Sequence, residues 1–207
     1  MTFGGWVKFN TAAIWMIKLA YINILWILFT IVGLVIFGLF PATVAMFTIV
    51  RKWIRKENNV KIFPVFWIVF RTEFIKANGF GLLFILIGYI LYYDFTFLQL
   101  NDGKLVYLLP VFIFILVSYA VTLLFFFPVF VHFDLRFFQY IKQSFLIAIT
   151  SPIETLLIAV SIILIYFAIT LLPGMIPLFS GSVIAVVITW TSFKAFRRIE
   201  RRKDSTS

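Results

Sequence analysis

The chain has 207 residues, of which 63% are hydrophobic and 13% are charged, and its formal net charge is +10. Ordinary soluble domains contain about 45–50% apolar and about 25% charged residues. No soluble core of this size can bury so much apolar surface, so the composition predicts an integral membrane protein. The absence of cysteine excludes disulfides and thiol catalysis, and a single histidine leaves few ligands for a zinc site.

The first long uncharged run, residues 19–50, contains Pro41. Because a proline inside a helix removes a backbone hydrogen bond, we expect the first span to end there and 42–56 to lie along the cytoplasmic surface. The N-terminus would then be outside, with Lys8 and Lys18 on the outer side. The alternative is a re-entrant hairpin over "VGLVIFGLFPATVAMF", which places the N-terminus inside.

Runs of about 20 apolar residues identify membrane spans. We therefore predict an all-α, polytopic helix bundle, a single domain over 1–207 with about five transmembrane helices at 19–40, 77–98, 105–131, 152–172 and 182–193. Interfacial amphipathic segments are expected on the cytoplasmic side at 42–56, 63–76 and 134–150.

Basic residues are concentrated in two blocks that border the apolar runs, one from Arg51 to Lys76 and one from Lys194 to Lys203. An excess of Lys and Arg marks cytoplasmic loops, so the pattern predicts contact with anionic inner-leaflet lipid and not with nucleic acid. The basic tail, 194–207, is expected in the cytoplasm. The residues predicted to bind headgroups are Arg51, Lys52, Arg55 and Lys56.

A small set of residues, most of them polar and inside or beside the spans, is expected either to pack against a neighbouring helix or to contact a substrate. The candidates are Asn23, Trp26, Thr30, Pro41, Thr43 and Asn78. Asn78 also suits the cap of the second span, and glycines at 33 and 38 would permit close helix packing.

Two polar clusters border the later spans. Ser151 and Glu154 flank a proline with the spacing of a capping box, which predicts that they cap the fourth span. His132, Asp134 and Arg136 predict an interfacial turn with a local ion pair, because no serine or cysteine nucleophile stands nearby to complete a catalytic triad.

Several stretches carry a resemblance to a known family. They are "YINILWILFTIVGLVIFGLFPATVAMFTIVRKWIRKE", "FWIVFRTEFIKANGFGLL", "SPIETLL" and "ITWTSFKAFRRIE", and their most specific pieces are Asn23-x-x-Trp26, Pro41-Ala42-Thr43 and Asn78-x-x-Gly81. They resemble the YesL family of bacterial membrane proteins, whose function is undefined. The resemblance implies the bacterial cell membrane and, because such genes often lie beside carbohydrate importers, a role near carbohydrate uptake.

No residue pattern specifies a reaction, so no catalytic, cofactor or metal residue is assigned. We predict a non-enzymatic accessory or assembly component linked to carbohydrate uptake, with inner-leaflet lipids and an importer permease as partners. A small-solute transporter is the alternative, and a membrane-embedded enzyme is the third class. The sequence leaves the oligomeric state open.

Overall fold

The computed structural model describes residues 3–57, 59–100 and 106–204, and within these residues all regular structure is helical. The elements, in chain order, are α1 (Phe3–Val32), α2 (Ile36–Ile54), α3 (Ile62–Thr72), α4 (Phe74–Leu100), η1 (Val106–Leu108), α5 (Leu109–His132), α6 (Phe137–Thr150), α7 (Pro152–Leu171), η2 (Pro173–Met175) and α8 (Ile176–Asp204).

The predicted all-α class is confirmed, and within the described ranges six helices are long and apolar enough to cross a membrane. These are α1, α2, α4, α5, α7 and α8, one more than the five spans expected. The last predicted span, 182–193, is the middle of α8, a helix of 29 residues that continues through both of its flanks. The short helices α3 and α6 correspond to the amphipathic segments predicted at 63–76 and 134–150.

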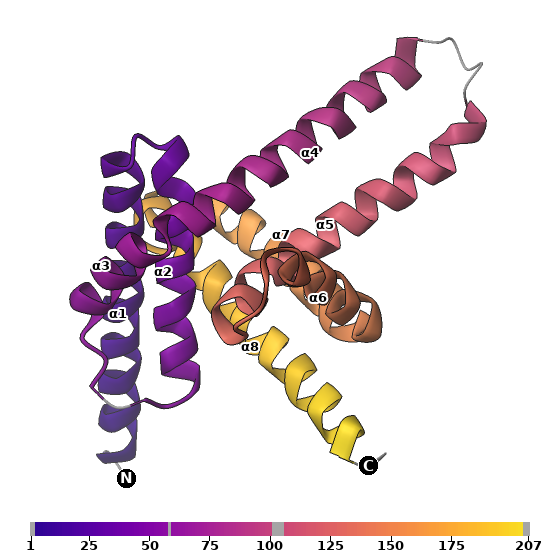
Figure 1. Ribbon diagram of the computed structural model, residues 1–207. Helices are drawn as coiled ribbons and strands as arrows, with labels where there is room; N and C mark the ends of the chain where they lie inside the picture. Colours follow the sequence, from indigo (N-terminus) through magenta and orange to yellow (C-terminus); the bar gives the residue numbers. More distant parts are fainter. Residues whose placement is uncertain (1–2, 58, 101–105, 205–207) are drawn as a thin grey trace.

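The additional long helix comes from an N-terminal hairpin. α1 ends at Val32, α2 begins at Ile36, and Pro41 lies inside α2. The two helices run side by side in opposite directions (Figure 1). The prediction that one span continues to residue 40 and that Pro41 separates it from a surface helix is therefore wrong. The chain reverses direction at residues 33–35, before the proline, and most of the stretch in the hairpin alternative forms the continuous helix α2.

A tight turn at Leu34 makes this reversal. The Val35 N–H donates to the Thr30 carbonyl over 2.8 Å, and the Leu34 N–H donates to the Ile31 carbonyl over 2.9 Å. These two bonds form a Schellman motif, in which the residue after the helix adopts positive φ and is usually glycine. Here Leu34 occupies that position with a φ of 59° and an exposed side chain.

We expect Leu34→Gly to stabilise the protein by about 1 kcal/mol, because glycine adopts positive φ without the steric cost that a side chain incurs. The thermal unfolding midpoint in detergent measures the effect. Val32→Gly is the matched control: Val32 lies two residues earlier and is also exposed, but it is helical, so the change should destabilise the protein by about 1 kcal/mol. Destabilisation by both changes would contradict the strained turn.

The hairpin is covered on one side by α3 (Figure 1). Phe66 and Phe70 of α3 are buried, and their ring centroids lie 5.1 Å and 5.0 Å from that of Phe29 in α1. Aromatic pairs at such distances add to the free energy gained from burial. The amphipathic face predicted for this segment is therefore a packing face against the hairpin.

Helices α4 and α5 leave the rest of the molecule as a pair, called here the α4–α5 arm (Figure 1). The base of the arm is anchored by aromatic packing of Phe80 against Phe126, Phe137 and Tyr140. The outer parts of the arm expose large apolar side chains, including Leu86, Tyr93 and Phe114.

Candidate functional site

Asn23 joins α1 to the beginning of α8. Its fully buried side chain donates from Nδ2 to the Pro177 carbonyl over 2.8 Å, and its Oδ1 accepts from the N–H groups of Gly181 and Ser182 over 2.9 Å and 3.0 Å. An uninterrupted helix pairs the carbonyl of residue 177 with the N–H of residue 181. The Asn23 amide thus bridges two groups that belong to one rung of α8, which is the geometry of a helix-packing contact.

Trp26, about one turn after Asn23 in α1, joins the two helices of the hairpin. Its indole Nε1 donates to Thr43 Oγ1 over 2.9 Å, and that hydroxyl donates to the Leu39 carbonyl over 2.7 Å. Thr30, which shares the predicted polar face, donates instead to the Trp26 carbonyl within its own helix. The structure therefore brings Trp26 and Thr43 together and leaves Thr30 outside the contact.

Asn78 supplies the hydrogen-bond donor that Pro41 lacks. The missing N–H of Pro41 leaves the Phe37 carbonyl without its helical donor, and Asn78 Nδ2 donates to that carbonyl over 2.9 Å and to the Phe74 carbonyl over 2.9 Å. The close approach of α4 depends on Gly81, where a Cβ would lie 2.4 Å from the Phe40 ring. Asn78 lies inside α4 and does not cap it, so the predicted cap is wrong.

We expect the effects of Asn78→Leu and Pro41→Ala on stability to be non-additive. Asn78→Leu alone should cost about 1–2 kcal/mol, because the Phe37 carbonyl loses its donor. In the Pro41→Ala background the restored backbone N–H supplies a donor, so the cost should fall by about 0.5–1 kcal/mol. A double-mutant cycle of unfolding free energies in detergent measures the coupling, and strictly additive effects would contradict this pairing.

An apolar cavity of about 380 Å³ lies where α1, α2, α5 and α8 meet. Its volume is within the roughly 300–1,000 Å³ range of small-molecule sites. The polar residues in its wall are Trp26, Thr43 and Ser180, and the remaining lining is apolar. The full lining is Trp26, Thr43, Met46, Phe47, Leu123, Leu124, Phe127, Ser180, Gly181, Ile184 and Ile188.

The four bases at the end of α2 have different surroundings. Arg51 Nη1 donates to the Val131 carbonyl at the end of α5, and Lys52 Nζ forms an ion pair with Glu57 at 2.7 Å. Arg55 and Lys56 are exposed. A guanidinium group at a helix C-terminus interacts favourably with the unpaired carbonyls there. Arg51 is therefore a contact between α2 and α5, whereas the predicted binding of lipid headgroups stays a prediction.

The predicted capping box at the beginning of α7 does not form. Pro152 is the first residue of α7 as predicted, but Ser151 makes no side-chain cap hydrogen bond. Glu154 Oε1 lies 3.5 Å from Arg198 Nη1 of α8. The carboxylate is directed to the neighbouring helix because Glu154 is buried against α8, where a guanidinium group is a better partner than a backbone N–H.

His132 is separated from Asp134 and Arg136. The imidazole ring packs against Phe133, Phe193 and Phe196, with ring centroids 4.6–4.9 Å apart. Asp134 and Arg136 are exposed, and no ion pair links either of them to another described residue. The local ion pair predicted for this turn is therefore absent from the described part of the chain, and the partial burial of His132 was not anticipated.

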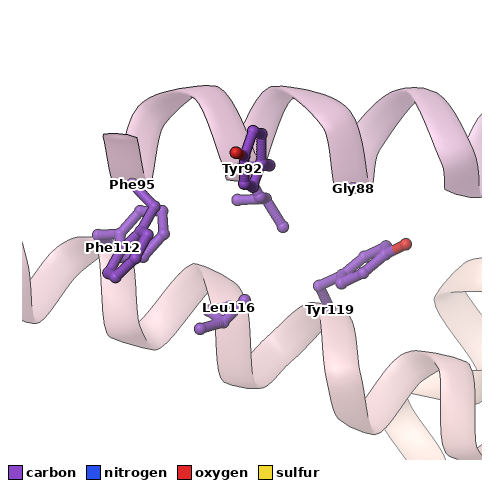
Figure 2. Close-up of a pocket in the computed structure, with 7 residues that line it drawn as sticks. Gly88, Tyr92, Phe95, Phe112, Leu116 and Tyr119 are labelled. Carbon is purple, nitrogen blue, oxygen red and sulfur yellow. The ribbon is translucent and has the colours of Figure 1, made fainter. Parts of the chain in front are cut away.

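A second cavity, of about 290 Å³, separates α4 from α5 within the arm. Figure 2 shows Tyr92 and Phe95 of α4 opposite Phe112, Leu116 and Tyr119 of α5. The Tyr119 hydroxyl donates to the Phe84 carbonyl over 2.9 Å at the inner end of this cavity. The lining is almost entirely apolar, so the cavity is typical of loosely packed helices that lipid or another helix can contact.

Sequence reasoning did not identify Ser180, Gly181 and Ser192 of α8. Each is a small residue in an apolar run and gives no periodic signal of its own. The useful signal was Asn23, a buried amide that needs partners elsewhere in the chain, but the sequence does not indicate where those partners lie.

Comparisons with known proteins agree with the motifs. A family model described as "Protein of unknown function, DUF624" matches residues 19–95. The chain is 37% identical over 199 residues to "Uncharacterized protein YesL" of Bacillus subtilis (strain 168), an alignment covering 94% of this chain and 92% of the relative. It is 37% identical over 172 residues to "Uncharacterized protein YteU" of the same organism, with 83% of this chain and 77% of the relative covered.

A third relative from that organism, "Uncharacterized protein YesV", is 29% identical over 185 residues, with 89% of each chain covered. No solved structure matches the chain. The similarity to the first two relatives extends over most of the chain. The chain therefore belongs to the YesL family, as its sequence motifs indicated.

Proposed function

We propose that this protein is a non-catalytic accessory or assembly component of a carbohydrate importer in the bacterial cell membrane. The observation that carries the proposal is that polar residues within the long helices form hydrogen bonds between helices. Asn23, Trp26 and Asn78 all hydrogen-bond to groups on neighbouring helices. Side chains used in this way fix helix positions, which is what a scaffold requires, and the carbohydrate link rests on the family resemblance.

The α4–α5 arm supports the same proposal. It extends away from the other helices (Figure 1), and its outer residues Leu86, Ile90 and Tyr93 are at least half exposed. A pair of apolar helices with a free face provides a surface against which a transmembrane helix of a permease can pack.

Site-specific photocrosslinking tests this proposal. A photoreactive amino acid at Leu86 or Ile90 of α4 should crosslink an importer permease in intact cells. The same amino acid at Leu164 of α7, which is equally apolar and exposed, is the control and should give lipid adducts only. Crosslinks of equal yield from both helices, or none to a permease from α4, would contradict the proposal.

The cavity between α1, α2, α5 and α8 favours a second candidate, a small-solute transporter. Reconstitution distinguishes the two functions, because a transporter should accumulate solute in proteoliposomes that contain this chain alone. An accessory component should do so only when the permease is reconstituted with it.

We also propose that both termini face the cytoplasm. In Figure 1 the N-terminal end of α1, the chain after α2 and the C-terminal end of α8 lie toward the lower edge, opposite the α1–α2 turn. The bases Arg51, Lys52 and Arg198 belong to that lower side. This orientation follows the positive-inside pattern and also places Lys8 and Lys18 inside, in contrast to the outer N-terminus expected from the sequence.

Cysteine labelling checks this orientation in a chain that has no native cysteine. Leu34→Cys in the hairpin turn should react with an impermeant maleimide on intact cells. Asn59→Cys, which is exposed after α2, should react only after permeabilisation, and so should Thr2→Cys, whose position lies outside the described residues. Labelling of Thr2→Cys from outside would restore the five-span arrangement, and an unreactive Leu34→Cys would indicate a re-entrant hairpin.

A further inference from the structure

Three buried polar atoms without hydrogen-bond partners lie on the three helices α2, α5 and α8. They are Nε of Arg51, Nδ1 of His132 and Oγ of Ser192, and they are three of the five such side-chain atoms in the described residues. Leaving a buried polar group unpaired costs about 1–3 kcal/mol. Each unpaired buried polar atom in a native structure calls for an explanation, and a bound ligand is one of them.

The three helices place these atoms at one level of the molecule. Arg51 Nη1 donates to the carbonyl of Val131, the residue before His132. The His132 ring in turn lies 4.9 Å from the ring of Phe193, the residue after Ser192. Helices α2, α5 and α8 also pack against one another pairwise.

This level is one helical turn beyond the apolar cavity. The cavity lining includes Phe47 of α2, Phe127 of α5 and Ile188 of α8, and the rings of Phe47 and Phe127 stack at 5.3 Å. Four residues after each lining residue come Arg51, Val131 and Ser192, and residues four apart lie on one face of a helix. Arg51 and Ser192 therefore lie one turn beyond the cavity on the faces of α2 and α8 that line it, and His132 follows Val131 at the same level of α5.

The charges at this level suit an anionic ligand. Arg51 is permanently charged, and Arg55 follows it one turn later at the exposed end of α2. The acidic residue closest in sequence, Glu57, is already paired with Lys52 at 2.7 Å, and Glu154, which is buried against α8, is paired with Arg198 at 3.5 Å. An oxyanion can accept hydrogen bonds from the guanidinium Nε–H, an imidazole N–H and a hydroxyl at once.

We propose that this site binds an anionic phospholipid, with the phosphate at Arg51, His132 and Ser192 and one acyl chain in the apolar cavity. The apolar cavity and the polar cluster account for the two parts of the ligand, and the exposed end of α2 provides the connection to the membrane surface. Basic pockets between transmembrane helices are known to hold lipid headgroups. This binding site goes beyond the accessory role and does not depend on it.

Lipid titration of the purified full-length protein in detergent, followed by native mass spectrometry, tests the site. Dioleoyl phosphatidylglycerol should bind at least about tenfold more tightly than dioleoyl phosphatidylcholine, which has the same acyl chains but no net charge. Arg51→Gln should remove about tenfold of that affinity. Lys142→Gln, an exposed base of α6 outside the proposed site, is the control and should change the affinity less than about twofold. Equal affinity for the two lipids, or equal losses in the two variants, would overturn the proposal.

Ser192→Ala separates ligand binding from folding. Because the hydroxyl has no hydrogen-bond partner among the described residues, its removal should leave the thermal midpoint of the lipid-free protein unchanged or higher. The same change should weaken phosphatidylglycerol binding several-fold, since one hydrogen bond to the phosphate is lost. Ile184→Trp should weaken binding from the other end by filling the cavity. Unchanged affinity in both variants would overturn the proposal. Inorganic phosphate at millimolar concentration is the second test. If it raised the thermal midpoint as much as the lipid does, a free anion would occupy the site and the proposal would be overturned.

Discussion

Replacing Asn23 by leucine, which has nearly the same shape, should destabilise the protein by about 3 kcal/mol. The leucine removes one donor and one acceptor at once, so the Pro177 carbonyl and the N–H groups of Gly181 and Ser182 lose their side-chain partner inside the bundle. Each unsatisfied buried group costs about 1–3 kcal/mol, and partial re-pairing within α8 reduces the total. The free energy of unfolding in mixed micelles measures the effect.

Thr48→Val is the matched control for this change. The Thr48 hydroxyl donates over 2.8 Å to the Val44 carbonyl within α2, so its loss leaves no group on another helix unpaired. We expect a cost below about 1 kcal/mol. A similar cost for Asn23→Leu would show that α8 closes its own hydrogen bonds and that the bridge contributes little.

Gly38→Ala should lower the free energy of unfolding by about 3 kcal/mol and should separate the two helices of the hairpin. A Cβ at Gly38 would lie 2.4 Å from the Thr30 carbonyl oxygen and 2.6 Å from that of Phe29. These are backbone atoms, which cannot move aside by changing rotamer, so α1 and α2 must shift apart. The Trp26–Thr43 hydrogen bond should weaken with this shift, and the Trp26 fluorescence change in a variant lacking the other tryptophans would report it.

Gly79→Ala is the control for the glycine position. A Cβ there would meet only the Phe137 ring, at 3.6 Å, which is ordinary van der Waals contact. Since alanine is the better helix former by about 1 kcal/mol, this variant should be neutral or slightly more stable. Destabilisation of equal size in both variants would mean that the crowding at Gly38 is not the cause.

The family pattern Pro41-Ala42-Thr43 with Asn78 has a physical explanation in the structure. Pro41 leaves one carbonyl of α2 unpaired, and Asn78 of α4 pairs with it. The Thr43 hydroxyl oxygen accepts a hydrogen bond from the Trp26 indole N–H. The motif residues are far apart in the sequence but together hold α1, α2 and α4 in place, so they describe how the helices pack and leave the reaction or ligand undefined.

Composition and apolar run length determined the all-helical membrane class, the boundaries of α4 and α7 to within a few residues, and the amphipathic helices α3 and α6. These properties are local: they depend on how many apolar residues follow one another and on where charges and prolines interrupt them. The capping box at Ser151 was also argued locally, and it failed because Glu154 interacts with Arg198 of another helix.

Only the tertiary structure decided the hairpin, because a membrane helix tolerates an internal proline where a group from elsewhere in the chain pairs with the carbonyl that the proline leaves free. In this chain Asn78 supplies that donor, 41 residues away from Phe37, and the turn forms instead at Leu34, where two glycines let the backbones of α1 and α2 touch. The same reason applies to Asn23, His132 and Ser192. Their partners, or the absence of partners, depend on which helices lie side by side, and that arrangement is not encoded in any one stretch of the sequence.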